Sequence, residues 1–221
     1  MLEIQNLSKE FPVEKGIFTK SSLSVKAVQD VSFSINKNQV LGLVGESGSG
    51  KSTLGKTIMK LLNPTNGQIV FDHEDITDYN NRQMIKVRKK IQMIFQDPFA
   101  SLNPRKNIFD TLAEPVKVHG LVNRSNIKEY ISDIINDVGL NVDSLSRYPH
   151  EFSGGQRQRI GIARSLVLKP QFIIADEPVS ALDVSIQAQV LNLLEKIRDV
   201  YNLTMIFISH DLSVIEYFSD N

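Results

Sequence analysis

The glycine-rich stretch GESGSGKST, residues 45–53, constrains the fold of this 221-residue chain more than any other segment. It matches the pattern G-x-x-x-x-G-K-[ST] and follows the apolar run QVLGLV. The next residues place Leu54, Ile58, Leu61 and Leu62 on one face of a predicted helix. Glycines in that setting let successive backbone N–H groups converge on phosphate oxygens at the start of a helix. The stretch therefore predicts a strand, a phosphate-binding loop and a helix.

The side chains of this loop predict a nucleoside triphosphate as its ligand. Lys51 is placed to reach the β- and γ-phosphates, and the Ser52 hydroxyl is placed to ligate Mg²⁺. No N-K-x-D pattern, which reads guanine, occurs where such proteins carry it, so adenine or a loosely read base is favoured. The predicted nucleotide-binding residues of the loop are Gly45, Glu46, Ser47, Gly48, Ser49, Gly50, Lys51, Ser52 and Thr53.

A second polar feature ends the apolar run FIIADEP, residues 172–178. Carboxylates at the carboxyl end of a parallel strand face the ligand crevice of an α/β sheet. Asp176 suits an outer-sphere contact to Mg²⁺, and Glu177 is placed to polarise the attacking water. A positioned base of this kind contributes about 10² to 10⁴ in rate.

The composition excludes several classes of function. Lysine plus arginine and aspartate plus glutamate number 25 each, so no basic field argues for nucleic acid as a bulk partner. The absence of cysteine excludes disulfides, thiol nucleophiles and cysteine-ligated metals. No apolar run approaches the roughly 18 residues of a membrane span, and the N-terminus lacks a signal-peptide core.

Strand-like and helical patterns alternate along the chain. LEIQNL and VKAVQDVSFSI predict half-buried antiparallel strands, whereas QVLGLVG, FIIAD and MIFIS predict parallel strands covered on both faces. QIVFD and KIQMIFQ are further strand-like runs. SNIKEYISDIINDVG predicts a helix from Ser125 as N-cap to Gly139 as C-terminal stop, and SIQAQVLNLLEKIRDVY predicts another.

These patterns predict one α/β domain, a P-loop NTPase core with an N-terminal antiparallel β subdomain and an inserted α-helical subdomain. The antiparallel region is expected over residues 1–38, the core over 39–96 and 153–221, and the helical subdomain over 97–152. The polar segment 14–26 is expected to be an exposed loop between the first strands.

A second glycine turn, Ser153-Gly154-Gly155-Gln156, precedes a basic helix. The helix pattern places arginines 157, 159 and 164 on one side and apolar residues 160, 163 and 167 on the other. A capping serine explains the start of a helix, but it does not explain two consecutive glycines.

With these motifs together, the chain resembles the nucleotide-binding subunit of an ATP-binding cassette (ABC) transporter, and FSGGQ resembles the signature motif of that family. The resemblance covers essentially the whole chain. It implies that Ser153, Gly154, Gly155 and Gln156 contact the ATP of a second ATP-binding subunit, identical or not, in a head-to-tail dimer. ATP with Mg²⁺ is then the implied cofactor, and ATP hydrolysis is the implied activity.

The resemblance also implies roles for residues outside these motifs. Gln96, in IFQDP, matches the glutamine that senses Mg²⁺ and the attacking water, and His210 matches the histidine that contacts the γ-phosphate. Phe11 sits where the family has an aromatic that stacks on adenine, with Phe18 as a rival. The loop that crosses the dimer interface corresponds to Ser180, Ala181, Leu182 and Asp183. Catalytic roles thus fall to Glu177, His210 and Gln96, and metal contacts to Ser52, Gln96 and Asp176.

Within the family, FQDPFASLNPR and YPHEFSGGQRQRIGIARSL resemble the oligopeptide/dipeptide importer branch, which includes nickel and glutathione importers. The resemblance implies integral membrane permease subunits as partners, a solute-binding protein indirectly, and a peripheral position on the cytoplasmic face of the membrane. Family members continue beyond the HDLSVIEYFSDN stretch, so the chain is expected to be truncated at its C-terminus.

Two alternatives stay open from the sequence. Cassette ATPases of DNA repair or translation carry similar motifs, but their coiled coils, zinc modules or paired cassettes are not visible here. A truncated fragment that binds ATP without turnover is the other.

Overall fold

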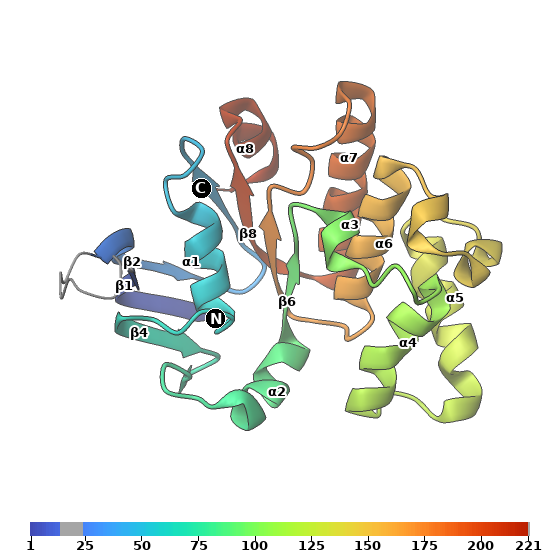
Figure 1. Cartoon of the computed structure of the whole chain (residues 1–221), viewed down its shortest axis with the longest axis horizontal. Helices are drawn as coiled ribbons and strands as arrows, with labels where there is room; N and C mark the ends of the chain where they lie inside the picture. The colour runs from blue at the N-terminus through green and yellow to red at the C-terminus, as the bar shows by residue number, and fades with distance from the viewer. Residues whose placement is uncertain (14–23, 221) are drawn as a thin grey trace.

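The computed structural model describes residues 1–13 and 24–220, which form two four-stranded sheets and a set of helices (Figure 1). The expected loop at 14–26 lies mostly outside the described residues, and its last three residues belong to strand β2. One sheet has the order β2-β1-β4-β5, formed by β1 (Leu2–Pro12), β2 (Ser24–Ile35), β4 (Asn66–Phe71) and β5 (Glu74–Asp75). The other has the order β3-β8-β7-β6, formed by β3 (Val40–Val44), β6 (Ile91–Ile94), β7 (Phe172–Asp176) and β8 (Thr204–Ser209).

Helices surround the second sheet and extend to one side of it (Figure 1). They are α1 (Lys51–Ile58), α2 (Asn81–Lys90), α3 (Pro98–Ser101), α4 (Ile108–His119), α5 (Ile127–Asp137), α6 (Gly154–Leu166), α7 (Val184–Tyr201) and α8 (Leu212–Phe218). Three short 3₁₀ turns are η1 (Arg124–Asn126), η2 (Val142–Ser146) and η3 (Pro149–Glu151). No helix in the described part of the chain has the length and apolarity needed to cross a bilayer.

Strands β7 and β8 divide the core into two halves. Every residue of both strands is buried, and their pairing with β3 and β6 is parallel, as the continuous apolar runs predict. Successive side chains of a strand point to opposite faces. Thus Ile173 packs with the helical side of the molecule, whereas Phe172 packs with the antiparallel sheet and α1.

The antiparallel sheet is larger than the sequence predicts. Residues 66–75 were expected in the P-loop core, but β4 pairs antiparallel with β1 and β5 pairs with β4. The burial of β4 alternates, with Ile69 and Phe71 inside, as in a strand covered on one face only. The Phe71 ring packs edge-on against the Phe172 ring, with 6.2 Å between the ring centres, and so joins this sheet to the core.

Two helix ends differ from the predicted ones. Helix α1 ends at Ile58 because Lys60 adopts a left-handed conformation (φ +53°), after which the Leu61 and Leu62 N–H groups both donate to the Lys56 carbonyl. Leu61, predicted on the buried face, is therefore exposed. Ser125 does not cap α5, since it lies inside the turn η1 and the helix begins two residues later. Gly139 ends this helix as predicted, with φ +72°.

Phe172→Ala tests the junction between the two sheets. The side chain is fully buried, so its removal leaves a cavity beside Phe71 and should lower the free energy of unfolding by about 3–5 kcal/mol. Urea titration measures the change. Val118→Ala, at an exposed valine, is the control and should stay within about 0.5 kcal/mol of wild type. Equal losses in the two variants would contradict the role assigned to Phe172.

Candidate nucleotide-binding site

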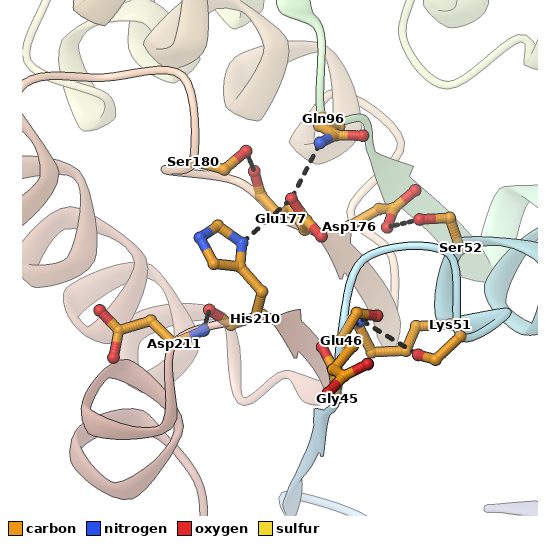
Figure 2. Close-up of polar contacts among 12 residues, drawn as sticks. Gly45, Glu46, Lys51, Ser52, Gln96, Asp176, Glu177, Ser180, His210 and Asp211 are labelled. Carbon is orange, nitrogen blue, oxygen red and sulfur yellow. Dashed lines mark hydrogen bonds and ion pairs between the residues drawn. The ribbon is translucent and has the colours of Figure 1, made fainter.

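The glycine-rich loop leaves the carboxyl end of β3 and enters α1, as predicted. Lys51 folds back over it: its Nζ donates to the carbonyl oxygens of Gly45 at 2.6 Å and Glu46 at 2.8 Å (Figure 2). A third contact reaches Ser49 Oγ at 3.3 Å. The ammonium group thus lies at the mouth of the loop, at the amino end of a helix whose dipole also favours an anion.

Gly50 is a position in this loop that requires glycine both for its backbone conformation and for space. Its φ is +95°, and a Cβ there would overlap the carbonyl oxygen of Ala27 in β2. The loop therefore packs directly against the antiparallel sheet. Gly50 also stands at the N-cap of α1 and offers no side chain to cap it. The first-turn N–H groups of α1 are consequently not satisfied by a cap side chain, which suits an anionic ligand.

Ser52 and Asp176 meet although 124 positions separate them. The Ser52 hydroxyl, in the first turn of α1, donates to Asp176 Oδ1 at 2.7 Å (Figure 2). Asp176 is the last residue of β7 and only 2% exposed. Burial raises the pKa of Asp176, and the hydrogen bond from Ser52 and the charge of Lys56 partly oppose this rise. A hydroxyl and a carboxylate at this spacing are oxygen donors of the kind that Mg²⁺ prefers.

Glu177 gathers groups from three neighbouring strand ends. Gln96, two residues beyond β6, donates from Nε2 to Glu177 Oε2 at 2.8 Å. His210, directly after β8, places Nδ1 3.4 Å from the same oxygen (Figure 2). Glu177 itself has φ +45°, unusual for a residue with a side chain, and its N–H donates to the Ile208 carbonyl. Such strain is concentrated at functional sites.

The loop after Glu177 connects this cluster to α7. Ser180 Oγ donates to the Glu177 carbonyl at 3.1 Å, and Gln187 Nε2 donates to the Leu182 carbonyl at 2.9 Å. Asp183 occupies the N-cap position of α7 without a side-chain cap bond. The predicted interface loop 180–183 is therefore fastened at both of its ends.

The second glycine turn forms the N-terminus of α6. Ser153 and Gln156 make a capping box, in which each side chain accepts from the other's backbone N–H. A Cβ on Gly155 would lie 2.6 Å from Ile186 of α7, so close helix packing explains this glycine. A Cβ on Gly154 would meet only Leu182, at 3.5 Å, which is an ordinary contact.

The arginines of α6 do not share one side of the helix, contrary to the prediction. Arg157 and Arg164 face α3, whereas Arg159 donates to the Val138 carbonyl and to Gln189 of α7. At 3.6 residues per turn, a residue two positions from Arg157 points to the opposite side.

The structure brings together Lys51, Ser52, Gln96, Asp176, Glu177 and His210 around the carboxyl edge of the parallel sheet. Within the described part of the chain, residues 153–156 form no hydrogen bond or ion pair with this group. Phe11 is 36% exposed in β1, with the Lys9 ammonium 5.0 Å from its ring centre. Its rival Phe18 lies outside the described residues.

The prediction from sequence missed Lys56. It lines a cavity together with Gln96 and Asp176, and its charge acts on the Asp176 carboxylate. Its place one turn after Ser52 in a predicted helix was the available signal, because residues four apart share a helix face. Residues 1–13 and 24–220 contain no cluster of three or more histidine, cysteine or acidic residues that could hold a metal alone.

Comparisons with known proteins agree with this geometry. A family model described as "ABC transporter" matches residues 28–180. The chain is 54% identical over its whole length to the oligopeptide transport ATP-binding protein AppF of Bacillus subtilis, and it covers 67% of that relative. It is 53% identical, again over its whole length, to OppF of Streptococcus mutans, of which it covers 70%.

The chain belongs to the ABC transporter family. A solved dimeric ABC cassette, MJ0796 in a post-hydrolysis state with ADP and Pi, superposes with a TM-score of 0.86 at 26% identity. The match covers 99% of this chain and 91% of the cassette, so the predicted ABC ATPase fold is confirmed. ABC membership also establishes ATP as the nucleotide and ATP hydrolysis in transport as the activity.

Asp176→Asn tests the electrostatics of the site through stability. The folded-state pKa of Asp176 lies above its ordinary value of 3.8, so between the two values the native chain binds more protons than the unfolded one. Stability therefore falls as pH rises through that window, and the asparagine variant should be more stable than wild type near neutral pH. Its advantage should shrink as the pH is lowered through the folded-state pKa towards the ordinary value.

Urea titrations at about pH 7 and at about pH 4, close to the ordinary pKa of 3.8, measure this difference. Asp133→Asn, at an exposed carboxylate on α5, is the control and should show no such advantage. A wild type more stable than the Asp176 variant near neutral pH would refute the effect of burial.

Proposed function

We propose that this chain is the ATP-hydrolysing subunit of an ABC importer of oligopeptides, bound peripherally to permease subunits at the cytoplasmic face of the membrane. The observation that carries the proposal is the convergence of Gln96 and His210 on Glu177, next to a complete phosphate-binding loop. Whole-length identity of 53–54% to oligopeptide transport ATP-binding proteins supports the substrate class.

The nucleotide would occupy the loop 45–53. Lys51, already held at the mouth of the loop, would exchange its contacts with the Gly45 and Glu46 carbonyls for β- and γ-phosphate oxygens. The first-turn N–H groups of α1 would bind the phosphates as well. Phe11, on the exposed end of β1, is the candidate to stack on the adenine.

Mg²⁺ fits the oxygen donors found beside this loop. Ser52 would ligate it, and Asp176 and Gln96 would hold it through their oxygens. The ion would neutralise charge on the phosphates when bound. Asp176 matches this role because burial and the Ser52 hydroxyl fix its position.

Glu177 would act as the base for the attacking water. Its carboxylate is held by Gln96 and lies within ion-pair distance of His210, so one oxygen is oriented before any substrate arrives. Gln96 would orient the water together with Glu177, and His210 would contact the γ-phosphate from the other side. The strained backbone at Glu177 is consistent with a position set by function.

A second ATP-binding subunit, identical or different, would complete the site. Within residues 1–13 and 24–220, Ser153 to Gln156 form no hydrogen bond or ion pair with this chain's own site, and the solved relative is dimeric. We propose that they bind the partner's γ-phosphate while loop 180–183 crosses the interface. We also propose that the chain has the subdomains of an ABC ATPase: an antiparallel β subdomain, a P-loop core and a helical subdomain over residues 97–152.

Glu177→Gln should lower the turnover number for ATP about 10²- to 10⁴-fold while ATP binding persists. The amide oxygen can still accept from Gln96, so the geometry survives and only the base is lost. Steady-state hydrolysis and ATP-dependent dimerisation by light scattering measure the two effects. Glu129→Gln, at an exposed acid on α5, is the matched control. Wild-type turnover in the Glu177 variant would remove Glu177 from the role of base.

Ser153→Arg should abolish ATP turnover in the assembled importer while the isolated chain binds ATP with unchanged affinity. The larger side chain would block the partner's phosphate but not the loop of its own chain. Ser153→Ala separates this effect from loss of the helix cap, which costs about 1 kcal/mol of stability. Nucleotide titration of the isolated variants decides: an equal loss of affinity would mean that the turn serves its own loop.

A further inference from the structure

The segment that carries Gln96 is weakly held by the rest of the core. None of the residues from Phe95 to Ser101, here called the Gln96 loop, is buried. A cavity of about 380 Å³ lies beneath it, lined by Gln96, Asp176, Lys56 and Arg164 among others. A segment with few buried apolar contacts opens at low energetic cost. Something else must keep Gln96 within 2.8 Å of Glu177.

One face of α6 supplies three contacts to this loop. Residues 157, 161 and 164 follow a spacing of four and three, so they lie in one row along the helix. The Arg157 guanidinium lies 4.9 Å from the Phe99 ring centre. Gly161 faces Pro98, whose Cβ would be 3.8 Å from a Cβ at that position. Figure 1 shows α3, which forms most of the loop, lying beside α6.

Arg164 makes the contact closest to the site. Its Nη1 donates to the Ser101 carbonyl, and its guanidinium lies 5.9 Å from the Phe95 ring centre. Arg164 therefore holds both ends of the Gln96 loop. Within the described residues it has no carboxylate at ion-pair distance, and burial lowers its pKa. A planar, weakly hydrated guanidinium tolerates such a place and can stack on a ring, whereas a lysine cannot do both.

Arg157 extends the contact to the second glycine turn, residues 153–156, here called the signature turn. Its Nε donates to the Pro149 carbonyl at 2.9 Å, in the turn η3 that leads into Ser153. The same guanidinium lies over the Phe99 ring, so one side chain contacts both the turn that leads into Ser153 and the Gln96 loop. A cation–π contact of this type contributes about 0.5–2 kcal/mol.

We propose that Arg157 and Arg164 are positioning residues that hold the Gln96 loop on α6 and thereby keep Gln96 at Glu177. Because α6 begins at the signature turn, a displacement of that turn by the partner's nucleotide reaches Gln96 through these two side chains. The inference rests on the proposed function, which gives Gln96 and Glu177 their roles. It adds a mechanical link between the two phosphate-binding turns inside one chain.

Arg157→Met tests the link with a readout that a merely structural loss would not produce. Methionine keeps apolar packing on Phe99 but removes the stacking charge and the bonds to η3. Amide hydrogen exchange of residues 95–102 in the nucleotide-free chain should become about tenfold faster. In the assembled importer kcat should fall about tenfold, with KM for ATP within about twofold of wild type.

The matched control is Arg159→Met. This arginine lies on the same helix, is partly buried and bonds a carbonyl, but it contacts α5 and α7 in place of the Gln96 loop. In this variant, both the amide hydrogen-exchange rates of residues 95–102 and kcat should stay within about twofold of the wild-type values. Arg157→Lys, which restores the charge without the planar fork, should recover only part of the effect.

The outcomes separate this inference from the proposed function. If Arg157→Met exchanges no faster at residues 95–102 than Arg159→Met, or if kcat and KM worsen together, the positioning role is wrong. If the wild-type importer hydrolyses no ATP, the proposed function fails, and the exchange comparison alone then decides whether α6 holds the loop. Arg164→Met repeats the comparison at the other contact, and urea titration reports whether that variant is folded.

Discussion

Burial of β7 and β8 on both faces is the constraint on which the rest of the structure depends. A strand covered from both sides has no place for a charge along its length, because a desolvated charge without partners is costly. Polar groups can therefore stand only where the strands end. Asp176 is the last residue of β7, and Glu177 and His210 follow directly. The parallel register, which pairs Asp176 with Ile208, then places the two later side chains within reach of each other.

The features that could be predicted from sequence are those set by local pattern. The glycine loop, the apolar strands, the acidic strand end and the cap at Ser153 all depend on neighbours within a few residues, and all lie where they were expected, whereas the cap predicted at Ser125 does not. The errors have both non-local and local causes. Residues 66–75 join the antiparallel sheet because β1 offers them a hydrogen-bonding edge, which no local pattern in 66–75 reveals. The end of α1 depends on a left-handed lysine, a conformation that lysine rarely adopts.

The candidate site shows the same difference between local and non-local features. Its residue types were predictable, but their contacts depend on pairing between distant segments, such as Ser52 with Asp176. The prediction from sequence did not include Lys56 because a lysine on a helix is usually solvated, and only the fold brings it near a buried carboxylate. The roles of Phe11 and of residues 153–156 stay predictions, since both require a ligand or a second chain to be realised.

The two glycines of the signature turn show how internal and external demands can be separated. Gly155 is required by this chain alone, because any side chain there would collide with Ile186 of α7. Gly154 is not: it has an ordinary backbone conformation, and a methyl group would meet Leu182 at a normal distance. The internal packing of the chain therefore accounts for one glycine and the capping serine, but not for the other glycine. A close approach of another molecule to the N-terminus of α6 would account for it, and the amino end of a helix suits an anion. Gly154 thus supports the proposed contact with the partner's phosphate, on grounds independent of family membership.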